Sequence, residues 1–173
     1  EDLSYSFVVF GEYRDHLAVL KLSPPGPRAA IEAAWYRQQS GQGCPRLLQV
    51  DESRGAILIE RVLPGTPAKQ LTIDGKDVQA TEAIAKVFLD LNAKGPREPF
   101  AFPHVSDFRK NLEALRNHNV PAKLIDRAVA LLEELTSDRS NDVVLHGDLH
   151  HRNVLLGKTG WVAIDPHGYV GPR

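Results

Sequence analysis

The chain has 173 residues, of which 42% are apolar and 25% are charged, and its formal net charge is −1. This length and balance predict one domain or two small lobes around a core, and they give no reason to expect nucleic acid or a membrane as a partner. The apolar runs are too short to cross a bilayer, and a single cysteine, Cys44, excludes an internal disulfide and fits a reducing cytoplasm. Because the sequence lacks an initiator methionine, we expect it to continue upstream.

Residues 1–62 are predicted to form a small antiparallel sheet and one helix. Strands are expected at 5–10 and 17–22, joined by a polar turn at 11–16, and at 46–50 and 56–59, joined by a turn at 51–55. Residues 29–36, between the two pairs, are rich in helix formers. Lys21 lies in an otherwise apolar strand, and Glu32 is the acidic residue of the helix. Taken alone, each would be an ordinary solvent-facing residue.

Residues 63–173 begin with helices and end with short strands. Helices are expected at 79–93, from Ser106, as the N-cap, to about 117, and from 121 to 135. In the first of them, a buried stripe is expected at positions i, i+3, i+4 and i+7, namely at Ile84, Val87, Phe88 and Leu91. These helices carry no evident chemistry, and we interpret them as scaffold.

Polar groups that bind metal or move protons gather between residues 143 and 168, VVLHGDLHHRNVLLGKTGWVAIDPHG. Three short apolar strands are expected here, at 143–145, 153–156 and 161–164. The polar groups stand at the ends of these strands, which should hold them rigidly. They are His146, Asp148, His150, His151, Asn153, Asp165 and His167.

The order of Asp148, Asn153 and Asp165 fits phosphoryl transfer. One aspartate orients the acceptor hydroxyl, and an asparagine and a second aspartate hold magnesium on the nucleotide phosphates. Two alternatives stay open. The first is a metal-dependent hydrolase, which would use the His146/Asp148/His150/His151 cluster. The second is a nucleotide-binding module that does not catalyse a reaction.

Residues 146–153, HGDLHHRN, followed by the Ile-Asp-Pro at 164–166, resemble the catalytic and magnesium-binding motifs of kinases. The H-G-D-x-H-x-x-N form is similar to that of the aminoglycoside phosphotransferase superfamily. The longer stretch from residue 145 to residue 171 resembles its streptomycin 6-kinase and hydroxyurea phosphotransferase branch. The resemblance implies an α+β, protein-kinase-like two-lobe fold. An antiparallel-sheet lobe at 1–62 would precede a mainly helical catalytic lobe at 63–173. Both lobes are expected to be partial, with substrate-binding helices missing.

The resemblance also implies an ATP- and Mg²⁺-dependent kinase. Asp148 would orient the acceptor hydroxyl and accept its proton, while Asn153 and Asp165 would hold the Mg²⁺. Lys21 would contact the nucleotide phosphates, and Glu32 would fix that lysine.

Adenine would be bound where the chain crosses between the lobes. The Glu60 carbonyl and the Val62 amide would contact it, with Ile59 at the back of the pocket and Leu155 and Ile164 beneath. The implied acceptor is a small molecule, foremost a cationic aminoglycoside, while hydroxyurea, a sugar or an amino alcohol remain open. The protein is expected to be a monomer or homodimer.

Overall fold

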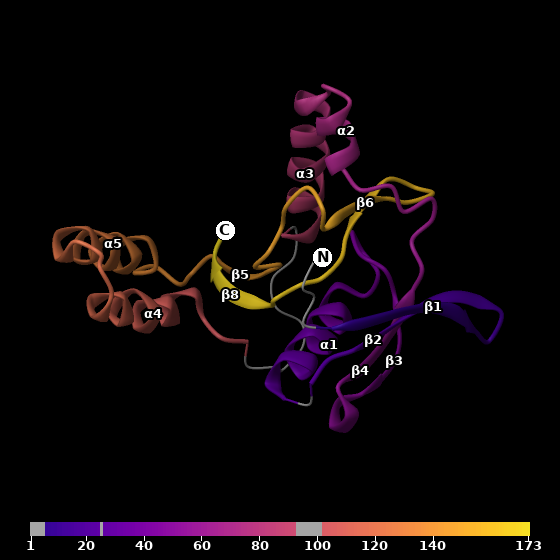
Figure 1. The fold of residues 1–173 in the computed structure, drawn as a ribbon, viewed down its shortest axis with the longest axis horizontal. Helices are drawn as coiled ribbons and strands as arrows, with labels where there is room; N and C mark the ends of the chain where they lie inside the picture. Colours follow the sequence, from indigo (N-terminus) through magenta and orange to yellow (C-terminus); the bar gives the residue numbers. More distant parts are fainter. Residues whose placement is uncertain (1–5, 25, 93–101) are drawn as a thin grey trace.

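The computed structural model describes residues 6–24, 26–92 and 102–173. A four-stranded antiparallel sheet has the order β1-β2-β4-β3. Its strands are β1 (Phe7–Tyr13), β2 (His16–Leu22), β3 (Leu47–Asp51) and β4 (Ala56–Glu60). Helix α1 (Pro27–Gln39) connects β2 to β3 and packs against β3 and β4 (Figure 1). The predicted start of the first strand at residue 5 and the predicted end of the helix at residue 93 lie outside the described residues.

The β1–β2 hairpin is tighter than the sequence predicted. Tyr13 pairs with His16, so the turn consists of Arg14 and Asp15 alone, and both have positive φ, at 47° and 64°. Two consecutive residues of positive φ are what a two-residue hairpin requires. The predicted turn at 11–16 was wrong because the polar ends of both strands continue the ladder.

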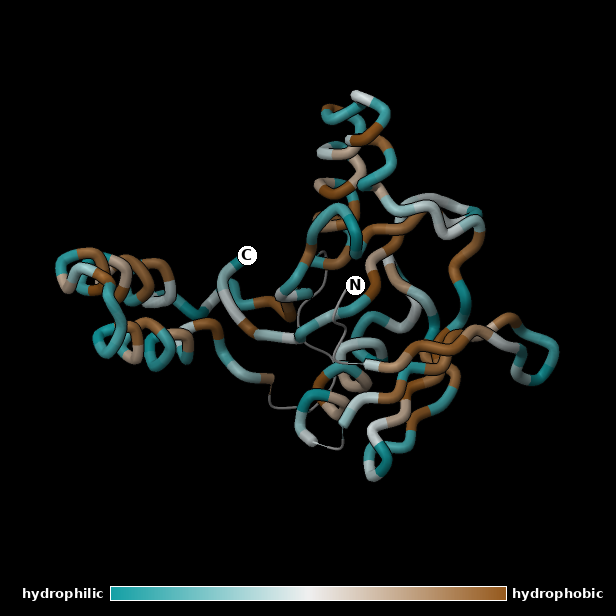
Figure 2. The backbone as a smooth tube through the Cα atoms, viewed as in Figure 1, coloured by the Kyte–Doolittle hydropathy of each residue, from teal (hydrophilic) through white to brown (hydrophobic). Residues whose placement is uncertain are grey.

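Side-chain alternation in the sheet separates a covered face from an open one. The register pairs Val19 with Ile59 and Lys21 with Ile57, which places these side chains on one face. Ile57 and Ile59 are buried there in the core that includes Trp35 of α1. Figure 2 shows hydrophobic residues along the strands and hydrophilic residues at the turns. Lys21 therefore lies on the face that points into the molecule.

Four helices and three 3₁₀ turns make up the remaining helical structure of the described residues. The helices are α2 (Lys69–Ile73), α3 (Asp77–Leu91), α4 (Phe108–Ala114) and α5 (Ala122–Leu135), and the turns are η1 (Glu52–Arg54), η2 (Val105–Asp107) and η3 (Leu115–Asn117). Helices α4 and α5 pack together and extend to one side of the sheet (Figure 1). No helix in the described ranges is long and apolar enough to span a bilayer.

Two details of the helical prediction were wrong. The buried residues of α3 are Ala80, Ala83, Val87 and Leu91, whereas Phe88 is 40% exposed. Ser106 does not cap α4 but lies in η2, where the side chain of His104 accepts a hydrogen bond from its backbone N–H. In α3, two small alanines take buried positions that a search for large apolar residues does not find. At Ser106, the turn depends on a hydrogen bond with His104, which a hydrophobicity pattern does not show.

The polar residues of the 143–168 stretch lie between two small antiparallel pairs of strands. β5 (Asp142–Leu145) pairs with β8 (Tyr169–Pro172), and β6 (Val154–Leu156) pairs with β7 (Trp161–Ala163). Strand β8 was not predicted. The His146 carbonyl accepts hydrogen bonds from the amides of His167 and Gly168, at 2.8 and 3.1 Å. This backbone clamp holds the loop after β5 against the loop after β7.

Candidate active site

A buried lysine connects the sheet, helix α1 and the loop after β7. The Lys21 Nζ lies 2.5 Å from Glu32 Oε1 and also contacts the Asp165 carboxylate. The side chains of Lys21 and Glu32 are only 9% and 5% exposed, whereas that of Asp165 is 48% exposed. Burial alone would lower the pKa of Lys21, but the two carboxylates outweigh it and raise that pKa above its ordinary value. The lysine is therefore a fixed positive charge.

Local structure explains why these three side chains meet. Lys21 projects from the covered face of the sheet, and Glu32 belongs to the buried face of α1 with Ala29 and Ala33. Asp165 follows β7 with a φ of 60°, a left-handed conformation that costs a non-glycine residue roughly 1–2 kcal/mol. Such a cost at one polar loop residue is typical of functional sites.

Asp148, in the loop after β5, accepts a hydrogen bond from Asn153, and two histidine rings lie near the same carboxylate oxygen. The Asn153 amide nitrogen lies 3.0 Å from the Asp148 carbonyl and 3.2 Å from its Oδ2. His150 Nε2 and His167 Nε2 lie 3.6 and 3.8 Å from the same Oδ2. The side chain is 41% exposed. Within the described part of the chain, these nitrogens all approach Oδ2, which leaves Oδ1 as the oxygen available to an incoming hydroxyl.

The His146 side chain hydrogen-bonds to both the loop after β5 and the loop after β7. Its Nε2 lies 2.9 Å from the Ile164 carbonyl, and its Nδ1 accepts from the Asp148 amide at 3.3 Å. A carbonyl oxygen only accepts, so the proton of the neutral ring is on Nε2. Burial lowers the pKa of His146 to about 4. The ring is therefore a neutral spacer between the two loops.

The residues predicted to contact adenine line one cleft of about 270 Å³, which also contains Lys21 and Asp165. They are Ile59, Glu60, Val62, Leu155 and Ile164. The prediction missed further lining residues, among them Val8, Phe10, Val19 and Arg61, whose guanidinium lies 4.7 Å from the Phe10 ring centre. Strand alternation would have found Val19, two residues before Lys21, whereas nothing in the sequence marked the others.

The side chains present fit a magnesium ion better than a histidine-bound metal. The amide nitrogen of Asn153 is used by Asp148, so its carbonyl oxygen remains for a cation, and the Asp165 carboxylate is half exposed. Magnesium commonly takes one or two protein oxygens and completes its shell with water and phosphate. Among the described residues no group of three or more His, Cys, Asp or Glu has metal-binding geometry. Because both ring nitrogens of His146 are engaged, the hydrolase alternative loses one of its ligands.

Together, a strand lysine tied to a helix carboxylate and to an aspartate on a distant loop, beside a cleft under an antiparallel sheet, defines a kinase-like protein. The chain belongs to the aminoglycoside/hydroxyurea antibiotic resistance kinase family, whose model matches residues 5–173. The predicted family and the predicted kinase-like α+β fold are thus confirmed, while the boundary between lobes at residues 62 and 63 stays a prediction.

Named relatives support this assignment. Streptomycin 3''-kinase of Klebsiella pneumoniae is 31% identical over 163 residues, which cover 92% of this chain and 58% of the relative. Hydroxyurea phosphotransferase of Kitasatospora aureofaciens is 31% identical over 163 residues, which cover 89% and 46%. The chain therefore spans about half the length of these curated relatives. A thermostable mutant of aminoglycoside phosphotransferase APH(4)-Ia, 15% identical, has a TM-score of 0.68 over 99% of this chain and 67% of that one, a likeness of fold.

Proposed function

We propose that the protein is an ATP- and Mg²⁺-dependent cytoplasmic phosphotransferase that moves the γ-phosphoryl group to a hydroxyl of a small molecule. A cationic aminoglycoside such as streptomycin is the favoured acceptor, so that phosphorylation would inactivate an antibiotic. The observation that carries this proposal is the Lys21 ammonium, held between Glu32 and Asp165 at the cleft. The family and the names of the relatives support the acceptor class.

In the proposed mechanism the chain supplies charge and position. Lys21 contacts the nucleotide phosphates, and Glu32 keeps its ammonium in place. Asn153 and Asp165 would hold Mg²⁺, which supplies charge neutralisation on the phosphate oxygens. Asp148 Oδ1 accepts the hydrogen bond of the acceptor hydroxyl and takes its proton as the new P–O bond forms. At the same time the bond from the γ-phosphorus to the bridging oxygen breaks, and ADP leaves with that oxygen, while Asp148 Oδ2 stays fixed by Asn153.

Backbone hydrogen bonding favours the proposed adenine contacts. The Glu60 amide donates to the Arg46 carbonyl and the Arg61 amide donates to the Leu17 carbonyl, both at 2.9 Å, so these donors are used by neighbouring segments. No backbone carbonyl of the described residues accepts from the Val62 amide. Val62 is one of the residues that line the cleft, and its backbone N–H is therefore suited to donate to a ring nitrogen of adenine.

The test is ATP consumption by the purified protein with Mg²⁺, across a panel of aminoglycosides that includes streptomycin, and with hydroxyurea. Asp148→Asn should lower kcat by a factor of about 10²–10⁴, the usual contribution of a positioned general base. Asp74→Asn is the matched control, because the Asp74 carboxylate is exposed and bonds only its helix neighbour Gln70 among the contacts described. Equal acceptor-dependent ATP consumption by the parent and Asp148→Asn would refute the role of Asp148.

A further inference from the structure

His167 contacts two functional segments at once, and the proposed mechanism has not used it. Its Nε2 lies 3.2 Å from Arg28 Nη2 in the first turn of α1 and 3.8 Å from Asp148 Oδ2. The side chains of His167 and Asp148 are 37% and 41% exposed, so solvent reaches both.

The position of His167 is fixed by backbone contacts between its loop and the loop after β5. Its amide donates to the His146 carbonyl at 2.8 Å. Gly147, with φ of 82°, passes directly over it, and a Cβ there would lie 3.1 Å from the His167 Cβ and 2.5 Å from the Tyr169 ring. The loop that carries Asp148 and the loop that carries His167 are therefore packed so closely that only glycine fits between them.

Arg28 determines which nitrogen of His167 carries the proton. A guanidinium only donates hydrogen bonds, so His167 Nε2 accepts from Arg28, and the proton of the neutral ring is on Nδ1. With its proton on Nδ1, the ring has no hydrogen on Nε2 to donate to Asp148. The Nδ1–H remains as the donor that the ring can offer to a bound molecule.

Helix α1 thereby contacts residues on both the nucleotide side and the acceptor side of the proposed site. Glu32 holds Lys21 on the nucleotide side, and Arg28, one turn earlier, holds His167 on the side of Asp148. Arg28 and Glu32 are four residues apart on α1, so their side chains lie on the same face of the helix.

We propose that His167 is an acceptor-binding residue and that Arg28 is the positioning residue that orients it. The neutral ring donates from Nδ1–H to an oxygen of a polyhydroxylated acceptor, and thereby directs a neighbouring hydroxyl toward Asp148 Oδ1. This inference rests on the proposed phosphotransferase function and goes beyond it, since it names the residues that select and orient the acceptor.

The test compares the KM for streptomycin with the Kd of MgADP. His167→Ala should raise the KM for streptomycin about tenfold, the usual effect of losing one hydrogen bond to a substrate, and should leave the Kd of MgADP within about twofold. His167→Gln keeps an acceptor for Arg28 and a donor for the substrate, so it should recover part of the loss. Arg28→Met should raise the same KM by a smaller factor, because the ring remains but loses its orientation.

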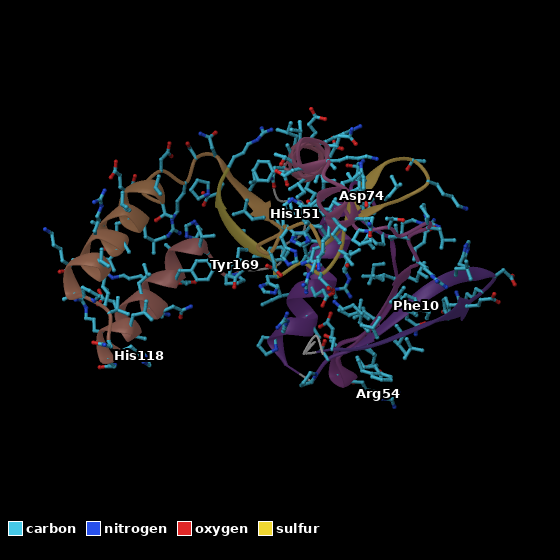
Figure 3. The ribbon with its side chains drawn as sticks, turned by 45° about the horizontal axis from the view of Figure 1, so that its top comes forward. Phe10, Arg54, Asp74, His118, His151 and Tyr169 are labelled. Carbon is cyan, nitrogen blue, oxygen red and sulfur yellow. The ribbon has the colours of Figure 1, made fainter. Side chains whose placement is uncertain are left out.

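Two variants control for indirect effects. Arg37→Met removes an exposed arginine of the same helix that pairs with Glu52 instead, and His118→Ala removes an exposed histidine at the far end of the α4–α5 arm (Figure 3). Both should match the parent. An unchanged KM for streptomycin in His167→Ala, or an equal rise in the Kd of MgADP, would overturn the assignment. If the parent itself phosphorylates neither streptomycin nor another panel member, the proposed function fails, and this inference fails with it.

Discussion

At the scale of single residues, His146 links the two loops of the site through both ring nitrogens. Its Nε2–H donates to the Ile164 carbonyl, and its Nδ1 accepts from the Asp148 amide. The ring also packs edge-on against Trp35, with 5.2 Å between ring centres. A second proton would need the Nδ1 lone pair that already accepts from Asp148, and it would add a charge to a buried ring. Burial and this bond therefore both oppose protonation.

This environment predicts acid sensitivity. The pKa of His146 is lowered from 6.5 to about 4 by burial, although the charges of Asp148 and Asp165 act in the opposite direction and His167 adds to the lowering. The unfolded chain therefore binds a proton before the folded one does. The stabilising effect is complete above about pH 6.5 and is lost as the pH falls toward 4, by roughly 3 kcal/mol in the free energy of unfolding.

Urea unfolding of the parent and of His146→Gln between pH 4 and 7.5 measures this effect. The variant should lose less stability than the parent over that range, because its amide does not titrate. His118→Gln, an exposed histidine on the distant arm, should keep the slope of the parent. Parallel pH profiles for the parent and His146→Gln would contradict the prediction.

Residue identities near the motifs were predictable, but their partners were only partly so. The motif order identified Asp148 and Asp165, and the helix composition singled out Glu32 because it is the acidic residue in that segment. Arg28 could not be found in this way, since an arginine in a first helical turn is ordinary on any surface. Its contact with His167 depends on how α1 meets a loop far along the chain.

At the scale of elements, α1 and the loop after β7 approach each other at Gly168. This glycine has φ of 67°, and a Cβ there would lie 2.6 Å from Ile31 Cγ2 and 3.2 Å from the Phe102 ring. The close approach helps to bring the side chain of Arg28, on α1, within reach of His167. The contact between helix and loop therefore depends on the absence of a side chain at one position.

Gly168→Ala should consequently destabilise the protein through crowding as well as through backbone conformation. Gly75→Ala is a matched control, since Gly75 has φ of 74° but no atom within 4 Å of its added Cβ. We expect Gly168→Ala to cost about 1–3 kcal/mol more than Gly75→Ala in chemical unfolding, the usual cost of overpacking. Ile31→Ala removes the nearest clashing methyl group. In a protein that already carries Ile31→Ala, Gly168→Ala should therefore cost less stability than it does in the parent. Equal costs for the two glycine variants would show that the loop moves away freely.

Elements with strong apolar patterns were predicted, and elements that depend on distant partners were not. The strands of the main sheet and helices α1, α3 and α5 have clear composition or periodicity. Helix α2 is too short to show a period. Strand β8 contains Gly171, where a Cβ would lie 2.5 Å from a Val105 methyl group, and Pro172. Its pairing with β5 is a tertiary contact that its own sequence does not encode.

At the scale of the whole molecule, the cleft is assembled from segments far apart in the chain. Val19, Lys21 and Ile59 come from the four-stranded sheet, whereas Leu155 comes from β6 and Asp165 from the loop after β7. A ligand that contacts both groups must stabilise their association. The order of the motifs predicted that Lys21, Ile59, Leu155 and Asp165 meet, but it did not include Val19, and the shape of the cleft follows only from the packed structure.

Nucleotide binding should therefore raise the thermal stability of the whole molecule, and magnesium should be needed for the full effect. At MgADP concentrations near 100 times Kd, linkage predicts about 2.7 kcal/mol of stabilisation, or a Tm increase of roughly 5–10 °C for a chain of this size. Without Mg²⁺, the Asp165 carboxylate faces the phosphates without a cation between them, so ADP with EDTA should give a smaller increase.

Asp165→Asn should lose most of the magnesium-dependent part of the Tm increase. Asp74→Asn should retain it, because the Asp74 carboxylate lies on an exposed turn after α2 (Figure 3). Differential scanning fluorimetry of the three proteins measures this. An identical Tm increase with and without Mg²⁺, or in Asp165→Asn and the parent, would show that Asp165 does not hold the metal.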